Sequence, residues 1–154
     1  KMVGDGSECE KARQYIRDLN LEGRIEVINY IPNHGMAEMY RQAHVFVFPS
    51  MREGMPKVVL EAMACGCPVV ATDIPGCREL VLDGRNGFLV PVGSPARIRD
   101  AIQGLHDNSG RLGEMGRMSR MLIERNHTWD AVALRIEGFY REVLRNGAGR
   151  KAWR

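Results

Sequence analysis

The sequence predicts an α/β fold in which helices flank a parallel β-sheet. Short strand-like segments alternate along the chain with segments of helical period, which is typical of parallel sheets. The runs 45–48 and 68–72 are apolar at almost every position, as expected for strands that are covered on both faces. A chain of 154 residues has the size of one domain, so we expect a single globular unit over residues 1–154.

Residues 2–93 carry the predicted α/β core. The first strand is short and ends in the glycine-rich stretch 4–6, so we expect the first strand–helix unit to be truncated. The segment 24–30 alternates and is rich in β-branched residues, which favours a strand that ends at Pro32. The predicted strands are 2–3, 24–30, 45–48, 68–72 and 88–90, and the predicted helices are 8–20, 36–43, 56–65 and 78–82.

Two helix boundaries are marked clearly. Pro56 is expected at the first helical position, and Gly66 is expected just past the helix end. Ser94 before Pro95 is a second start signal, after which we expect helices alone. The predicted all-helical part, 94–145, holds the helices 95–107, 111–125 and 128–145, and a basic tail over 146–154 follows it.

Charge and composition exclude several classes of protein. With 44% hydrophobic and 27% charged residues, the chain is neither disordered nor a membrane protein by composition. Its net charge of +3 is modest and its cations mostly alternate with acids, so we expect no nucleic-acid partner. The chain has no signal peptide and no run of about 20 apolar residues, so we expect a cytoplasmic location. The tail cations Arg145, Arg150, Lys151 and Arg154 leave peripheral contact with anionic lipid open as an alternative to a solvated chain end.

The sequence predicts no metal and no resident cofactor. Cys65 and Cys67 have a C-x-C spacing that does not suit a zinc site, and no second cysteine pair matches them. The four histidines are scattered, and no Asp-x-Asp pair is present. We expect the cysteines to be small buried thiols in a reducing compartment.

The predicted helix at 56–65 holds the most informative chemistry. It is apolar almost all round except for Lys57 and Glu61, which lie one turn apart on one stripe. One interpretation is an exposed ion pair that contributes little. However, the helix dipole disfavours a cation in the first turn, and Lys before Glu is the weaker order. An anion in front of the helix would remove both objections.

The phosphates of a nucleotide sugar would supply such an anion. We predict that Glu61 is largely buried and accepts hydrogen bonds from a ribose diol. Glu53 lies in the preceding loop and could receive sugar hydroxyls, and Gly54 beside it allows a ligand to approach the backbone closely. Ligands of open parallel sheets bind beyond the carboxyl ends of the strands, where the loops 4–6, 31–35 and 50–55 are expected.

The stretch EGMPKVVLEAMACGCPVVATD, residues 53–73, resembles the E-x7-E signature of retaining glycosyltransferases of family 4, which have the GT-B fold. Other segments resemble the family in the same order over most of residues 2–145: VGDG, RIEVINYIP, MYRQAHVFVFPS, RELVLDGRNGFLVP and TWDAVALRIEGFYREVL. The resemblance implies a Rossmann-like parallel sheet, the C-terminal half of a GT-B fold.

The resemblance also implies the roles of individual residues. Glu53 would contact the transferred sugar and Glu61 the ribose, so these two are the candidate catalytic residues. The main chain of the intervening segment would line the sugar and the phosphates, and the backbone at Ile31 would bind the base. The further donor-binding positions are Gly4, Gly54, Met55, Pro56, Lys57 and Val58.

The implied function is transfer of a hexose from a nucleoside-diphosphate sugar to an acceptor, such as a polysaccharide or lipid precursor, without a metal. The acceptor would bind an N-terminal domain that this sequence lacks. The sequence also lacks the segment that carries an Arg and a Lys, which hold the diphosphate in the family. We therefore expect the fragment alone to be inactive. The closing helix, 128–145, would cross back toward that domain. The alternatives are a non-catalytic nucleotide- or glycan-binding module, or an epimerase or phosphorylase of the same fold.

Pro56 departs from the pattern of the family. Many members have a glycine at this position, and its amide helps to hold the sugar. Proline has no amide hydrogen to donate, so the set of sugar hydroxyls that are recognised here is expected to differ.

Overall fold

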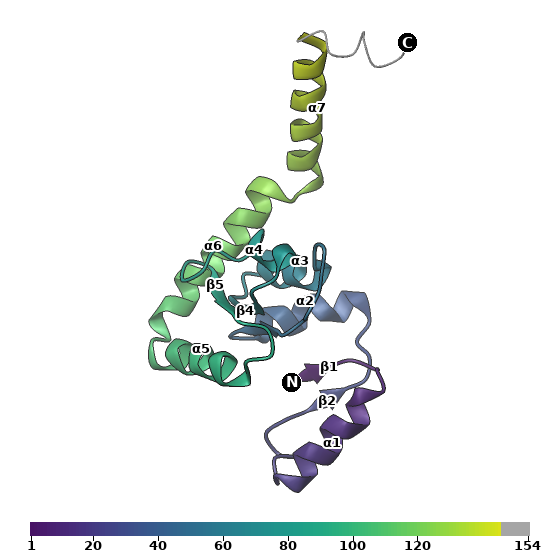
Figure 1. Cartoon of the computed structure of the whole chain (residues 1–154), viewed down its shortest axis with the longest axis vertical. Helices are drawn as coiled ribbons and strands as arrows, with labels where there is room; N and C mark the ends of the chain where they lie inside the picture. The colour runs from purple at the N-terminus through teal and green to yellow at the C-terminus, as the bar shows by residue number, and fades with distance from the viewer. Residues whose placement is uncertain (146–154) are drawn as a thin grey trace. The chain divides into compact units, whose positions relative to one another are not determined.

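The structure is a computed structural model that describes residues 1–145. It divides into two compact units, unit 1 over Lys1–Met39 and unit 2 from Tyr40 onward, and each is described by itself. Figure 1 shows the order of helices and strands along the chain. The predicted basic tail, 146–154, lies outside the described residues, and the prediction of a single domain stays a prediction.

Unit 1 is built on one strand–helix–strand arrangement. β1 (Met2–Val3) pairs in parallel with β2 (Val27–Ile28), and α1 (Glu8–Asp18) connects them. β2 is shorter than the predicted strand 24–30, because the amides of Arg24 and Ile25 bond to the carbonyl of Leu21 in a turn. α2 (Asn33–Gln42), whose last three residues belong to unit 2, begins earlier than predicted, since the carbonyl of Pro32 accepts the amides that open its first turn.

Unit 2 contains a three-stranded parallel sheet in the order β3-β4-β5. The strands are β3 (Phe46–Phe48), β4 (Val69–Thr72) and β5 (Gly87–Val90). The parallel pairing and the flanking helices confirm the predicted fold class, although the described strands form two hydrogen-bonded sheets and not one. The helices that follow the start of this sheet are α3 (Lys57–Ala64), α4 (Pro75–Arg78), α5 (Pro95–Asp107), α6 (Gly110–Asn126) and α7 (Trp129–Arg145).

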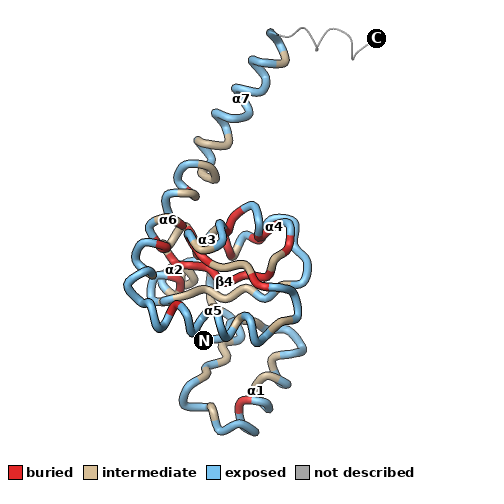
Figure 2. The backbone as a smooth tube through the Cα atoms, turned by 60° about the vertical axis from the view of Figure 1, so that its left-hand side comes forward, coloured by how far each residue is buried: buried red, intermediate tan, exposed pale blue. Residues whose placement is uncertain are grey.

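The central strand β4 is buried along its whole length, as Figure 2 shows. Its side chains alternate between two apolar clusters. Val69 and Ala71 pack with α3 residues such as Met63, whereas Val70 packs with Leu105 of α5. Both faces of the sheet are therefore covered, as the apolar run 68–72 predicted.

The boundaries of two helices differ from the predictions. Pro56 is the N-cap of α3 and not its first helical residue, while Gly66 lies just past the helix end, as predicted, and has φ 76°. α4 comes earlier than the predicted 78–82, because the carbonyl of Ile74 accepts the amides of Cys77 and Arg78. Pro75 provides the fixed φ angle that suits the first turn.

Candidate functional site

The loop between β3 and α3 carries Glu53, and the side chain of Glu53 is exposed. The hydroxyl of Ser50 lies 3.4 Å from Oε1 of Glu53 and 3.4 Å from the carbonyl oxygen of Arg52, which are long distances for hydrogen bonds. The start of the loop is held from outside, since Oγ1 of Thr72 donates to the carbonyl of Ser50. Thr72 is the last residue of β4 and is buried.

The beginning of α4 lies directly against this loop. A β-carbon placed on Gly76 would come within 2.8 Å of the carbonyl carbon of Gly54 and 2.9 Å of the carbonyl oxygen of Glu53. The next residue, Cys77, is buried, and its pKa is raised first by that burial and second by the negative charge of Glu53. Glu53 is therefore held close to the first residues of α4.

α3 presents Lys57 and Glu61 on one exposed stripe. Val59, Ala62 and Met63 form its buried face. The predicted stripe is confirmed, but the prediction that Glu61 is buried is wrong. Counting apolar residues around a helix does not show which face the fold covers, and here the covered face lies opposite Glu61. Lys57 and Glu61 do not form an ion pair with each other in the described part of the chain.

Tyr40 is the neighbour of Glu61 that the sequence did not predict. Its side chain is 4% exposed and packs edge-on against Phe46, with ring centroids 5.4 Å apart. The hydroxyl of Tyr40 lies 3.5 Å from Oε2 of Glu61, at the outer limit of a hydrogen bond. Burial and, second, the charge of Glu61 raise the pKa of Tyr40 to about 12, so this hydroxyl stays protonated and is a donor.

The first turn of α3 has backbone amides available to a ligand. The amides of Val59 and Leu60 donate to the carbonyl of Pro56, at 3.1 Å and 3.3 Å. Within residues 1–145, the amides of Lys57 and Val58 have no backbone acceptor, as is normal at a helix start. Pro56 is buried and donates nothing. Met55, the residue before Pro56, is 50% exposed.

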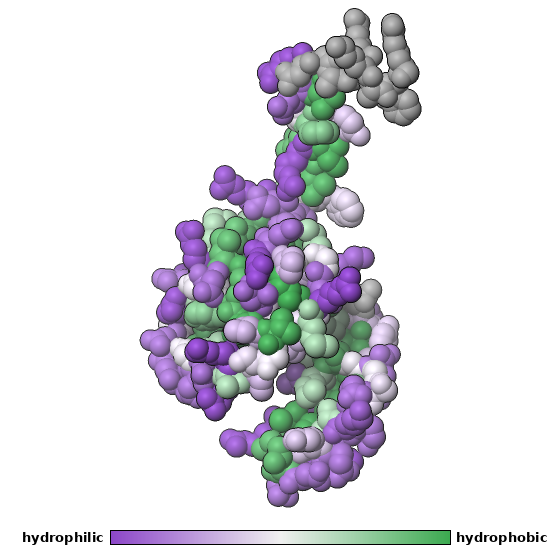
Figure 3. Space-filling model, in the orientation of Figure 1, coloured by the Kyte–Doolittle hydropathy of each residue, from purple (hydrophilic) through white to green (hydrophobic). Residues whose placement is uncertain are grey.

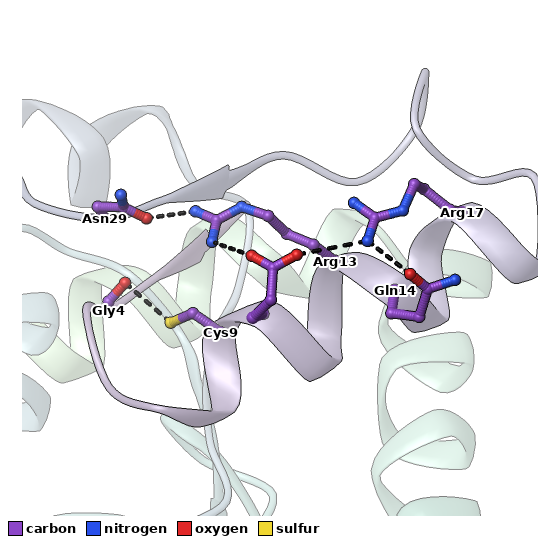
Figure 4. Close-up of polar contacts among 7 residues, drawn as sticks. Gly4, Cys9, Arg13, Gln14, Arg17 and Asn29 are labelled. Carbon is purple, nitrogen blue, oxygen red and sulfur yellow. Dashed lines mark hydrogen bonds and ion pairs between the residues drawn. The ribbon is translucent and has the colours of Figure 1, made fainter.

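Unit 1 holds the other two predicted positions, Gly4 and Ile31. The carbonyl of Gly4 accepts a hydrogen bond from the thiol of Cys9 at 3.0 Å, and Figure 4 shows this contact beside the polar residues of α1. The amide of Gly4 donates to the carbonyl of Ile28 at 2.9 Å, which continues the pairing of β1 with β2. Ile31 precedes α2, and its Cγ2 lies 3.0 Å from where a β-carbon on Gly35 would stand.

Two grooves in unit 2 lie away from the predicted residues. One, of about 440 Å³, is lined by residues at the end of α3 and along α6, and the other, of about 710 Å³, by residues of α6 and α7 and of their junction. Neither is lined by Glu53 or Glu61. We place the candidate site at the Glu53 loop and the start of α3, because the free amides and the two carboxylates are found there. Ligand clefts often form where two domains meet, so one domain alone need not show a closed pocket.

Residues 1–129 match the family of glycosyl transferases group 1. The chain belongs to this family. A D-inositol 3-phosphate glycosyltransferase of Paenarthrobacter aurescens is 34% identical over 137 residues, which cover 83% of this chain and 33% of that protein. The chain spans 30% to 40% of the length of the first curated relatives that it matches. The region that matches this chain is thus one part of each of these longer proteins.

Solved structures of glycosyltransferases have a fold similar to that of this chain. Sucrose-phosphate synthase of Thermosynechococcus elongatus superposes with a TM-score of 0.80 at 29% identity, over 93% of this chain and 36% of that one. TarM of S. aureus, in a complex that contains UDP, gives a TM-score of 0.77 at 28% identity, over 88% of this chain and 27% of that one. The Rossmann-like α/β fold of GT-B glycosyltransferases is confirmed.

Proposed function

We propose that this glycosyltransferase group 1 domain binds the donor of a retaining, metal-independent hexosyltransferase. The donor would be a nucleoside-diphosphate sugar, and the acceptor a polysaccharide or lipid precursor. The observation that carries the proposal is the geometry of residues 53–61. It combines an exposed carboxylate in the loop, two free amides at the start of α3, and a second carboxylate one turn into that helix. The UDP in the TarM complex supports a nucleotide as the ligand.

In this arrangement the diphosphate would lie in front of α3. The amides of Lys57 and Val58, the helix dipole and the Lys57 ammonium would share its negative charge. Glu61 would accept hydrogen bonds from the ribose. Tyr40 lies beside Oε2 of Glu61, so we assign this role to the other carboxylate oxygen. The exposure of Glu61 means that the ribose would replace water at this carboxylate.

The chemical step needs stabilisation of an oxocarbenium-like sugar and of the charge that grows on the leaving phosphate. We assign the second task to the amides and cations near α3, without a metal. Glu53 would bind sugar hydroxyls, and attack on the face from which the leaving group departs would give retention. A double displacement with Glu53 as nucleophile is the alternative chemistry for the same geometry.

The proposed enzyme also needs an N-terminal domain that binds the acceptor. The apolar side chains that α7 exposes would pack against that domain, as the resemblance to family 4 implies. We propose a cytoplasmic location, with the basic tail as a peripheral membrane contact. No helix within residues 1–145 is both long enough and apolar enough to cross a bilayer.

Calorimetric titration of the chain with UDP, GDP and ADP tests the donor site. We expect weak binding of at least one of them and no transfer activity from this chain alone. Glu61→Ala should weaken nucleotide binding by about tenfold, because a hydrogen bond to a charged group contributes about 1.5 kcal/mol. Glu53→Ala should leave the binding of a free diphosphate unchanged and abolish transfer in a two-domain enzyme that contains this domain.

Glu114→Ala is the matched control, since Glu114 is an exposed glutamate of α6. It should change neither binding nor transfer. No heat with any of the three nucleotides would remove the basis of the proposal. Equal losses of nucleotide binding in both site variants would contradict the division of roles between Glu53 and Glu61.

A further inference from the structure

We propose that Thr72 and Gly76 are positioning residues for sugar recognition. They form a floor beneath residues 50–54, which we call the sugar loop, and hold it in one conformation. This inference rests on the proposed function, because it assumes that Glu53 and its neighbours contact the transferred sugar. It adds two residues that lie outside the segment from Glu53 to Glu61 and that would act through the loop without contacting the ligand.

The first support of the sugar loop comes from the end of β4. β3 and β4 are paired as far as Phe48 and Ala71. Beyond that pair, the side chain of Thr72 donates a hydrogen bond to the carbonyl of Ser50 and so extends the connection between the two strands by one step. Because β4 is buried along its whole length, the backbone that carries this hydroxyl is held firmly in place.

The second support comes from Gly76 in α4. The atoms that a β-carbon on Gly76 would meet belong to the backbone of Glu53 and Gly54, and the closest is the carbonyl oxygen of Gly54. A flexible side chain could turn away from an added methyl group, but a backbone cannot. Any side chain at this position would therefore push the sugar loop away from α4, or α4 away from the sheet.

The sugar loop has little internal support. Residues 51–55 are all exposed, and the two hydrogen bonds of the Ser50 hydroxyl within the loop measure 3.4 Å. The residue after Gly76, Cys77, is buried, and its pKa is raised first by that burial and second by the charge of Glu53. The floor contacts thus reach the loop at positions 50, 53 and 54, and they determine where its backbone lies.

The floor is expected to affect the sugar more than the nucleotide. The ribose carboxylate, Glu61, lies on α3, which is held by its own buried face. The sugar would be bound by Glu53, which lies on the loop. A change in the floor should therefore alter the ratio of the dissociation constants for a nucleotide sugar and for the free nucleotide, which a general loss of structure would not do.

Thr72→Val tests the inference because it removes the hydroxyl and keeps the shape of the side chain. The probes are UDP and UDP-glucose, or the guanosine or adenosine pair if the titrations of the wild-type chain select that base. We expect Thr72→Val to weaken nucleotide-sugar binding at least fivefold and to change nucleotide binding less than twofold. Thr72→Ser restores the hydroxyl and should return both constants to within twofold of wild type.

Gly76→Ala should weaken nucleotide-sugar binding at least tenfold. Its matched control is Gly104→Ala in α5, where a β-carbon would meet no atom within 4 Å. Thr128→Val is the control for Thr72, since the Thr128 hydroxyl also has a backbone partner: it accepts a hydrogen bond from the amide of Ala131 at the start of α7. Both controls should leave the ratio of the two constants unchanged.

The results separate the two proposals. A wild-type chain that binds neither probe would overturn the proposed function and this inference with it. A wild-type chain that binds both, with an unchanged ratio in Thr72→Val, would overturn the positioning role alone. An equal loss for both probes in Thr72→Val, without rescue by Thr72→Ser, would mean that the residue is merely structural. If Gly76→Ala does not fold, the Thr72 variants still decide the question.

Discussion

Helices α3 and α7 of unit 2 differ in how far their apolar side chains are buried. α3 has 8 residues, and its buried face includes Val59 and Met63, which are 0% exposed. α7 has 17 residues and buries none of them. It leaves Trp129 89% exposed and Phe139 64% exposed. Figure 3 shows hydrophobic side chains gathered along the surface of α7.

The difference shows where each helix finds its partner. The apolar face of α3 packs on β4 and α6, so its partner is part of unit 2. The exposed apolar residues of α7 recur at helical spacing and mostly share one face, which is typical of a helix that packs against something. Among residues 1–145, nothing covers this face. Under the proposed function, α3 would bind the donor and α7 would pack against the N-terminal domain.

Truncation of a buried side chain of α3 should lower the stability of the chain the most. Met63→Ala should lower the free energy of unfolding by about 2–5 kcal/mol, because Met63 is fully buried and the smaller side chain leaves a cavity. Urea unfolding followed by circular dichroism measures this loss. Met121→Ala is the control, since Met121 is 48% exposed, and should change stability by less than about 0.5 kcal/mol. Equal losses in the two variants would contradict the burial of α3.

The sequence predicted the sheet of unit 2 and its long helices well. The strands at 45–48, 68–72 and 88–90 and the helices at 95–107, 111–125 and 128–145 agree with the structure to within two residues at each end. These segments carry strong local signals, namely long apolar runs, helical periodicity and start signals such as Ser94 before Pro95. Where the signal was weaker, as at 24–30, the backbone follows a local turn instead.

The sequence could not predict which groups meet at the candidate site. It singled out Glu53 and Glu61 by their spacing, but the exposure of Glu61 depends on which face of α3 the sheet covers. Tyr40 lies 21 positions before Glu61, and Thr72 lies 22 positions after Ser50. No periodicity links residues so far apart, because contacts of this kind arise only when segments that are distant in the sequence pack together: α2 with α3 in the first case, and the ends of β3 and β4 in the second.

The next effect concerns the exposed face of α7. Phe139→Ala should change the stability of this chain by less than about 0.5 kcal/mol, since Phe139 is largely exposed. In a two-domain protein that contains the proposed N-terminal domain, the same change should cost about 3 kcal/mol, as for a buried phenylalanine. Unfolding in urea measures both.

Leu134→Ala provides the control for Phe139→Ala. Leu134 is 68% exposed and points away from the main apolar face by helical spacing. It should have little effect in either protein. A small effect of Phe139→Ala in both proteins would show that the apolar face of α7 does not pack against an N-terminal domain, and α7 would then differ from α3 in lacking any partner.

The smallest effect concerns His127, which caps α6 just before α7 begins. Its pKa is lowered from 6.5, first by burial and second by the charge of Arg135 on α7. The Arg135 guanidinium also donates to the carbonyl of Asn126 at 3.3 Å. NMR titration of the ring protons should therefore give a pKa below 6.5, and Arg135→Ala should raise it.

The sign of the stability effect follows from the direction of this shift. The unfolded chain binds a proton at His127 more readily than the folded chain does. Stability therefore rises as the pH increases from the folded pKa to 6.5. The contribution of His127 is fully present above pH 6.5 and is lost as the pH falls from 6.5 through the folded pKa. Arg117→Ala is the control, since Arg117 lies about 15 Å away along α6. If Arg135→Ala leaves the pKa of His127 unchanged, the second turn of α7 does not lie beside the end of α6, and α7 contacts the rest of unit 2 even less than its exposure indicates.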